Sequence, residues 1–296
     1  MALFLRFRLA KQTFLLISAL LCAISAELHA QSGGRNEAGA AAQGMGNAAV
    51  TVGDAQAMFN NIGALCEVEK TTAWASYENR FSMLNLPTFS AGFVMPNSRN
   101  GAVGVGVWRF GDGVYNEHRL ALGYSHKVQG VSLGFQANYL QIMGQGTGQR
   151  SALVLEFGGV AQLSNKLFLG MHIYNLNQAK VQTFLDERLP TVMKAGLSYR
   201  PTNKLTINAE TEKDTDNPAY LKAGLAYDML SEKITLRMGL RSQPFSSFWG
   251  LSLRHRKLVI DYAFGYYDQP LGTSHGITLA YVIHKKSMSG SAKVTD

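Results

Sequence analysis

The stretch Lys257-Leu-Val-Ile-Asp-Tyr-Ala-Phe-Gly-Tyr266 alternates between large apolar side chains and a mixed set. Its even-numbered positions are all apolar or aromatic, whereas its odd-numbered positions include Asp261, Ala263 and Gly265. Successive side chains of a β-strand point to opposite faces of a sheet, so this period of two predicts a strand with one apolar face. The same alternation recurs from Trp74 to Ile283, in about fourteen segments.

These segments are long for strands. Their length of roughly ten residues fits the ~9–11 residues that a tilted strand needs to cross a bilayer, and it exceeds the ~5–6 residues of soluble strands. The sequence therefore predicts an all-β protein, a transmembrane antiparallel β-barrel of about 14 strands. We expect strands near 72–81, 87–95, 102–110, 117–127, 131–142, 151–162, 167–175, 190–200, 204–212, 219–228, 233–241, 247–255, 257–266 and 274–284.

The predicted connections differ in length between the two ends of this barrel. Those after even-numbered strands are short, as at 128–130, whereas those after odd-numbered strands are longer, as at 143–150 and 176–189. The first hairpin, at 82–86, is an exception. Short turns at one end and long loops at the other are typical of outer-membrane barrels whose termini both lie in the periplasm.

Charged residues gather on the face opposite the apolar one. A charge that faces lipid at mid-depth costs ~2–4 kcal/mol, so we expect this face to line the lumen. The charges then either select a ligand or pair with one another, and pairing is the favoured interpretation because it makes burial tolerable. The predicted lumen-facing set is Arg119, Glu156, Lys194, Glu210, Lys222, Arg237, Arg254 and Asp261.

The N-terminus resembles a secretory signal peptide. Arg6, Arg8 and Lys11 precede an apolar run, Thr13–Ile24, which is too short to span a bilayer, and Ala30 offers a small residue for cleavage. We therefore expect residues 1–30 to be a signal peptide and the mature protein to lie in the outer membrane. After the predicted barrel, 71–284, a tail of residues 285–296 follows.

Composition excludes several classes of function. The net charge of +8 is not concentrated in a basic cluster with aromatic residues, so nucleic-acid binding is disfavoured. Cys66 is the single cysteine after the signal, so no intramolecular disulfide is expected. The histidines lack metal-ligand spacing and no Gly-x-Ser-x-Gly elbow occurs. We therefore predict no catalytic residue, no metal and no cofactor.

Residues 31–70 form a predicted plug. This segment is rich in Gly, Ala, Asn and Gln, and it shows no strand alternation. A barrel of about fourteen strands is too wide for side chains alone to fill, and small residues allow a backbone to pass close to the wall. Asp54 is the expected N-cap of a short helical turn at 54–58, and Asn60, Asn61 and Gly63 form a turn signature.

A family resemblance supports the plug. Gly44-Met-Gly-Asn-Ala-Ala-Val50, followed by Asp54-Ala-Gln-Ala-Met-Phe-Asn-Asn-Ile-Gly-Ala-Leu65, resembles the N-terminal signature of FadL-type outer-membrane proteins, and more specifically of the PorV/PorQ branch. Asn61-Ile-Gly-Ala64 stands where that signature has Asn-Pro-Ala-Gly. The resemblance implies a fourteen-stranded barrel with a plugged lumen, and it makes Asp54, Asn60, Asn61 and Gly63 the hatch turn of the plug.

Three functions stay open at this point. The PorV/PorQ resemblance implies a non-enzymatic part in type IX secretion and surface attachment, with secretion components or exported proteins as partners. The broader FadL resemblance implies a plug-gated channel for hydrophobic small molecules, and an apolar site under the 176–189 loop would favour it. A lipid-modifying outer-membrane enzyme is the least favoured, and a Ser–His pair would support it. Outer-membrane lipid is an expected partner in each case.

Overall fold

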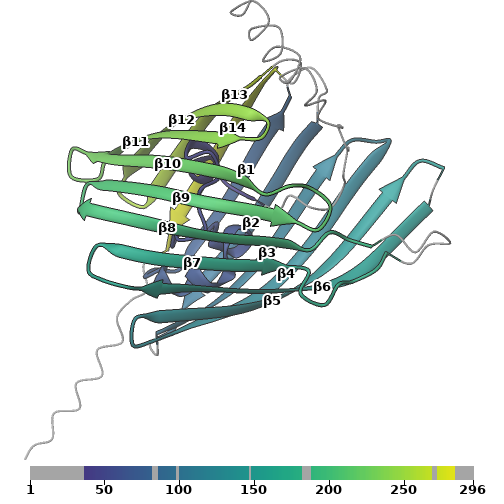
Figure 1. The fold of residues 1–296 in the computed structure, drawn as a ribbon, viewed down its shortest axis with the longest axis horizontal. Helices are drawn as coiled ribbons and strands as arrows, with labels where there is room; N and C mark the ends of the chain where they lie inside the picture. Colours follow the sequence, from purple (N-terminus) through teal and green to yellow (C-terminus); the bar gives the residue numbers. More distant parts are fainter. Residues whose placement is uncertain are drawn as a thin grey trace, which may run out of the picture. The chain divides into compact units, whose positions relative to one another are not determined.

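The strands of this protein close into one barrel. The computed structural model describes residues 37–81, 86–97, 100–146, 148–181, 188–268 and 272–283. Fourteen antiparallel strands pair in sequence order, and β1 pairs with β14 to close the ring (Figure 1). The predicted fold class is therefore confirmed. The predicted signal peptide at 1–30, the first residues of the predicted plug at 31–36 and the predicted tail at 285–296 lie outside the described residues.

Each strand pairs with its sequence neighbours through a regular register, apart from a bulge between Tyr199 and Thr202. The strands are β1 (Thr72–Arg80), β2 (Leu86–Pro96), β3 (Gly101–Gly111), β4 (Tyr115–Val128), β5 (Val131–Gly144), β6 (Gly148–Gln162), β7 (Leu167–Tyr174), β8 (Val192–Thr202), β9 (Leu205–Asp214), β10 (Tyr220–Met229), β11 (Ile234–Ser242), β12 (Phe245–His255), β13 (Leu258–Tyr267) and β14 (Gly272–Val282).

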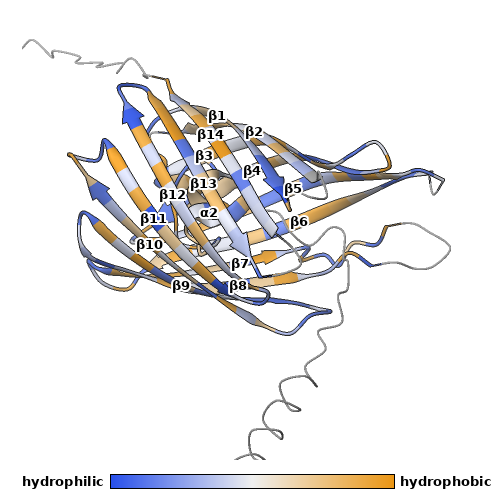
Figure 2. Cartoon of the chain, turned by 90° about the horizontal axis from the view of Figure 1, so that it is seen from above, coloured by the Kyte–Doolittle hydropathy of each residue, from blue (hydrophilic) through white to orange (hydrophobic). Residues whose placement is uncertain are grey.

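The two faces of the wall differ as the alternation predicted. Leu120, Leu122 and Met171 point outward and are 53%, 61% and 58% exposed, while Asp261 and Ala263 of β13 point inward and are buried. Apolar and polar residues accordingly alternate along the strands in Figure 2. An apolar belt of this extent around a closed barrel is typical of a surface that lipid covers. The outward face therefore indicates a barrel that crosses a membrane.

The connections depart from the prediction. We call the end where β1 begins and β14 ends the proximal end, and the opposite end the distal end. Distal connections are mostly short, because β5 and β6 continue pairing up to Gly144 and Gly148 and leave only 145–147 between them. Main-chain hydrogen bonds do not require apolar side chains, so the ladder extends past the apolar belt. The long distal connection is 175–191.

The N-terminal segment lies inside the barrel (Figure 1). We call residues 37–70 the plug. It contains two short helices and a 3-10 helix, namely α2 (Ala40–Gly44), α3 (Ala57–Asn60) and η1 (Ile62–Glu67). Helix α2 contacts β11 to β14, whereas η1 contacts β3 to β6, so the plug reaches opposite parts of the wall. Among the described residues, no helix is long and apolar enough to cross a bilayer.

Inward-facing glycines let the plug backbone touch the wall. A Cβ atom at Gly134 would lie 2.5 Å from the carbonyl oxygen of Ile62, and one at Gly170 would lie 2.6 Å from that of Val50. Such distances are too short for any larger residue without a shift of the backbone. We call the inward glycines that meet plug atoms the glycine ring; they are Gly104, Gly106, Gly123, Gly134, Gly158, Gly170, Gly196, Gly224, Gly239, Gly250 and Gly276.

Replacing Gly134 with valine tests this fit. The new side chain would collide with the Ile62 carbonyl, and overpacking of this kind costs about 1–3 kcal/mol. We expect a lower thermal unfolding midpoint in detergent and faster proteolysis of the plug. Ala137→Val is the control, because Ala137 lies on the same strand and points outward. Equal midpoints and equal cleavage for the two variants would contradict the proposed contact.

A plugged lumen with an apolar distal wall as the candidate functional site

Five buried charges fasten the plug to the wall. Lys222 Nζ lies 2.7 Å from Glu37 Oε1 of the plug and 3.1 Å from Glu210 Oε1, and it also contacts Glu212 Oε2. Lys194 Nζ lies 3.2 Å from the same Glu37 oxygen. We call Glu37, Lys194, Glu210, Glu212 and Lys222 the plug anchor. Because each charge has an opposite partner in reach, its burial is tolerated.

The plug anchor brings three predicted lumen residues together with two that the prediction missed. Lys194, Glu210 and Lys222 were expected in the lumen, and the structure places them side by side on β8, β9 and β10. Glu212 follows Glu210 at a spacing of two, so the alternation alone was enough to find it. Glu37 had no such signal, because it lies in a segment without strand periodicity.

Backbone groups of the plug also bond to the wall and to the predicted turn. The Val50 amide donates to Glu210 Oε2 at 2.8 Å, and Asn208 Nδ2 donates to the Ala48 carbonyl at 2.7 Å. Asn61 Nδ2 donates to the carbonyls of Val50 at 2.5 Å and Gly159 at 3.2 Å. These bonds satisfy polar groups that would otherwise be buried without partners.

The predicted hatch residues Asn60, Asn61 and Gly63 hold the plug in shape. Asn60 exchanges two hydrogen bonds with the Ala38 backbone, both 3.0 Å long. Asn61 Oδ1 accepts from the Gly63 amide at 3.0 Å and starts the 3-10 helix η1. The turn thus ties the start of the plug to its end, and it docks against β6 through Asn61.

Asp54 does not cap a helix as predicted, because α3 begins at Ala57 and Gln56 occupies the N-cap position. The Asp54 carboxyl lies partly buried in the plug. Burial raises its pKa to about 7, and the nearby charge of Asp261 adds to this rise. Arg237 and the backbone N–H groups of Gln56 and Ala57 act in the opposite direction. This carboxyl therefore titrates near neutral pH.

The remaining predicted lumen charges occupy separate places. Arg237 Nη1 lies 3.5 Å from Asp261 Oδ1, and Ser252 bonds to both side chains. Glu156 accepts from Asn138 Nδ2 and lies 2.9 Å from His172 Nε2, with both members of that pair buried. Arg254 is exposed at the proximal rim, where it pairs with Glu232.

Arg119 has an aromatic environment. Its guanidinium carbon lies 5.0 Å from the ring centres of both Trp108 and Tyr174, and Nη2 donates to the Tyr174 hydroxyl at 3.1 Å. The side chain is buried, and its Nε and Nη1 atoms have no partner among the described residues. Cation–π contact with two aromatic rings offsets part of the cost of burying this charge.

Part of the distal lumen wall, beside the buried Arg119, is apolar, which the sequence did not predict. Inward-facing side chains of β5, β6, β7 and β8 pack with Val181 and Leu189, two described residues of the 175–191 connection. We call this group the distal cluster; it comprises Leu140, Val154, Tyr174, Val181, Leu189 and Val192, each at most 6% exposed. The period-two alternation does not single out these inward positions, because the outward positions beside them are apolar too.

The wall beside the distal cluster is incompletely paired. In the described residues, β6 pairs with β7 from Phe157 to Gln162, so the distal half of β6 lacks a strand on that side. The 175–191 connection covers part of this edge instead. The Leu176 amide donates to the Leu155 carbonyl at 2.9 Å, and Asn177 bonds to the backbone of Leu155 and Leu153 at 2.9 and 2.8 Å. We call this stretch the β6–β7 seam.

Neither a metal site nor a hydrolytic pair stands out in the described residues. No group of three or more His, Cys, Asp or Glu side chains gathers there to hold a metal ion. The hydrogen bonds of the described histidines run to Glu156 from His172, to Tyr124 from His126 and to Tyr262 from His275, and none involves a serine. The contacts found among the described residues are therefore apolar packing, ion pairs and hydrogen bonds between the plug and the wall.

Comparison with solved structures identifies several barrels of the same fold. The CymD monoaromatic hydrocarbon channel aligns with a TM-score of 0.64 and 12% identity, covering 86% of this chain and 100% of its own. A Pseudomonas aeruginosa FadL homologue aligns with a TM-score of 0.61 and 13% identity, covering 83% of this chain and 98% of its own. The P. putida toluene transporter TodX aligns with a TM-score of 0.61 and 11% identity, covering 85% of this chain and 100% of its own. No family model and no curated protein matches the sequence. At these identities the likeness shows the fold.

Lys222→Met tests the plug anchor. The change removes the charge that three buried carboxylates share, and breaking a buried pair costs about 3–5 kcal/mol. We expect a lower denaturant midpoint and release of the plug to protease. Arg254→Gln breaks the exposed pair with Glu232, for which about 0–1 kcal/mol is expected. An anchor role is refuted when both variants behave alike.

The raised pKa of Asp54 predicts that the stability of the protein falls as the pH rises. Its pKa is raised in the folded protein, so the stability it contributes is complete below the ordinary value of 3.8 and is lost as pH rises through about 7. We expect the thermal midpoint to fall between about pH 4 and pH 7, and Asp54→Asn to reduce that fall because asparagine stays neutral. Parallel pH curves for the wild type and the variant would disprove the assignment.

Proposed function

We propose that this protein is an outer-membrane channel for hydrophobic small molecules. The observation that carries the proposal is the distal cluster, in which apolar side chains face the lumen beneath the 175–191 connection. A pore for polar solutes is lined by polar groups, whereas a site for hydrophobic molecules is lined mainly by apolar and aromatic side chains. The side chains of the distal cluster are of the second kind, and they pack against one another at 6% exposure or less.

The plug argues against an open aqueous pore. Its backbone and side-chain atoms meet the glycine ring around the wall, and the plug anchor holds it by buried charges. A solute that enters from the distal end therefore reaches the plug before it reaches the proximal end. The β6–β7 seam lies beside the distal cluster and is closed there by bonds of Leu176 and Asn177 rather than by a full ladder. We propose that a solute leaves the distal lumen through this seam when the plug moves.

The structural neighbours add support of a general kind. CymD is described as a monoaromatic hydrocarbon channel, and TodX as a toluene transporter. Both share the barrel fold over more than four fifths of this chain, at low identity. Export through a signal peptide and residence in the outer membrane belong to the same proposal, because the apolar belt requires a bilayer.

The alternatives have less support. No feature of the described residues favours the type IX secretion role implied by the PorV/PorQ resemblance, and the short distal connections offer little surface for cargo. An enzymatic role lacks a serine–histidine contact in the same residues. Normal export of surface proteins after gene deletion would argue against the secretion role.

Uptake into proteoliposomes tests the channel. We expect the wild-type protein to speed entry of an aromatic hydrocarbon or an alkane above the rate of protein-free liposomes. Leu140→Asn keeps the size of the side chain but puts an amide into the distal cluster, so uptake should fall about tenfold. Substrate-dependent quenching of a fluorescent reporter inside the vesicles measures the rate.

Leu163→Asn is the matched control, since the same exchange falls in the exposed connection after β6. Its uptake should equal that of the wild type. Wild-type rates no higher than those of empty liposomes would overturn the channel proposal. Unchanged uptake by Leu140→Asn would show that transport does not pass the distal cluster.

A further inference from the structure

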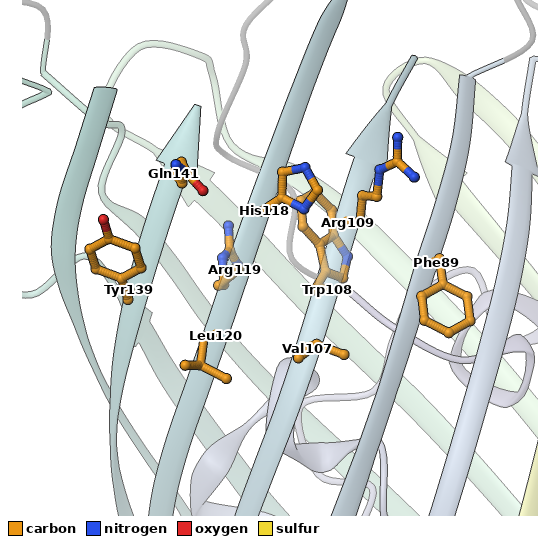
Figure 3. Close-up of a pocket in the computed structure, with 9 residues that line it drawn as sticks. All are labelled: Phe89, Val107, Trp108, Arg109, His118, Arg119, Leu120, Tyr139 and Gln141. Carbon is orange, nitrogen blue, oxygen red and sulfur yellow. The ribbon is translucent and has the colours of Figure 1, made fainter. Parts of the chain in front are cut away.

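A pocket of about 350 Å³ lies on the outer surface of the wall, away from the lumen. It spans β2, β3, β4 and β5 near the distal end (Figure 3). Phe89, Leu120 and Tyr139 line it and are 45%, 53% and 50% exposed, which places them on the outward face. Trp108 and Arg119 form its back and are buried on the lumen side.

Three polar side chains form the distal edge of this pocket. Arg109 on β3 is the register partner of His118 on β4, and His118 is the partner of Gln141 on β5. Directly paired positions in neighbouring strands lie within about 5.5 Å of each other, so the three side chains form one row. Figure 3 shows this row above the remaining lining residues.

Below the row the outward-facing lining of the pocket is apolar. Val107 and Leu120 are register partners, and so are Leu120 and Tyr139. Phe89 stands at the opposite side of the pocket from Tyr139 (Figure 3). The floor is therefore aliphatic with an aromatic ring on each side, which suits a hydrocarbon chain lying along the wall.

The row supplies donors without partners. No carboxylate lies within salt-bridge distance of Arg109 in the described residues, and no hydrogen bond of the Arg109, His118 or Gln141 side chains occurs there. The nearest acidic residue along the strand, Asp112, accepts the backbone amides of Val114 and Tyr115 instead. A guanidinium at the upper limit of the apolar belt therefore lacks an anion, and phosphate matches its planar fork.

We propose that this pocket binds a phosphorylated membrane lipid. One acyl chain lies over Val107 and Leu120 between the two aromatic rings, and a phosphate accepts hydrogen bonds from Arg109, with His118 and Gln141 beside it. In the orientation with both chain termini in the periplasm, the distal end meets the outer leaflet, so the lipid is the phosphorylated glycolipid of that leaflet. The site opens on the outer face of the wall, whereas the distal cluster lies on the lumen face, and lipid binding does not depend on transport.

Native mass spectrometry of the purified full-length barrel tests the site. The probes are diphosphorylated lipid A and its dephosphorylated form, each added to the protein in detergent. We expect the wild type to retain the phosphorylated lipid, and Arg109→Gln to bind it about tenfold more weakly or worse, since one charge-assisted contact is lost. Lys213→Gln is the control, because Lys213 lies near the distal end of β9 and bonds to Asn217.

Each outcome bears on the proposal. Equal retention by the wild type and Arg109→Gln, or equal binding of the two lipids, would overturn it. Displacement of the lipid by an equimolar amount of inorganic phosphate would also overturn it, because the ligand would then be a free anion. Heat-dependent mobility on a gel establishes that the variants are folded, and unchanged hydrocarbon uptake by Arg109→Gln separates this site from the proposed channel.

Discussion

Close contact between the plug backbone and inward-facing glycines is the constraint on which the rest of this structure depends. A ring of fourteen strands encloses more space than its own side chains fill. The chain fills that space with a segment whose carbonyl groups reach the wall at Gly134, Gly170 and Gly224. The glycines remove the side chains that would keep the two backbones apart, so the plug packs like a protein interior.

This packing explains why buried charges occur where they do. Besides the glycines, the plug meets polar and apolar side chains of the wall. The plug anchor pairs Glu37 with two lysines, and Phe59 packs edge-on against Trp74. Inward charges are thus partners of the plug and of one another rather than the lining of an open pore. Apolar inward residues pack against the plug around Phe59, and a second apolar group, the distal cluster, packs with Val181 and Leu189 of the 175–191 connection.

The barrel itself was predictable because a period of two survives in every strand, and the strand count needed nothing else. The polar lumen residues followed from the same alternation, and Lys194, Glu210 and Lys222 are placed together as pairing required. The partner Glu37 and the distal cluster were not predictable, since both arise from tertiary contacts of segments without periodicity. Strand ends were also missed, because main-chain pairing continues through polar residues such as Asn116 and Gln149.

The glycine ring has a consequence for how the molecule is assembled. Helix α2 bonds to the last strand through Ala40 to Thr278 and Gln43 to Ser274, and that strand also closes on β1. A segment that precedes all fourteen strands in the sequence therefore touches the last of them. A plug that is bound to β14 next to β1 is placed to guide β14 into register with β1. The segment that fills the finished barrel is thus also placed to assist its closure.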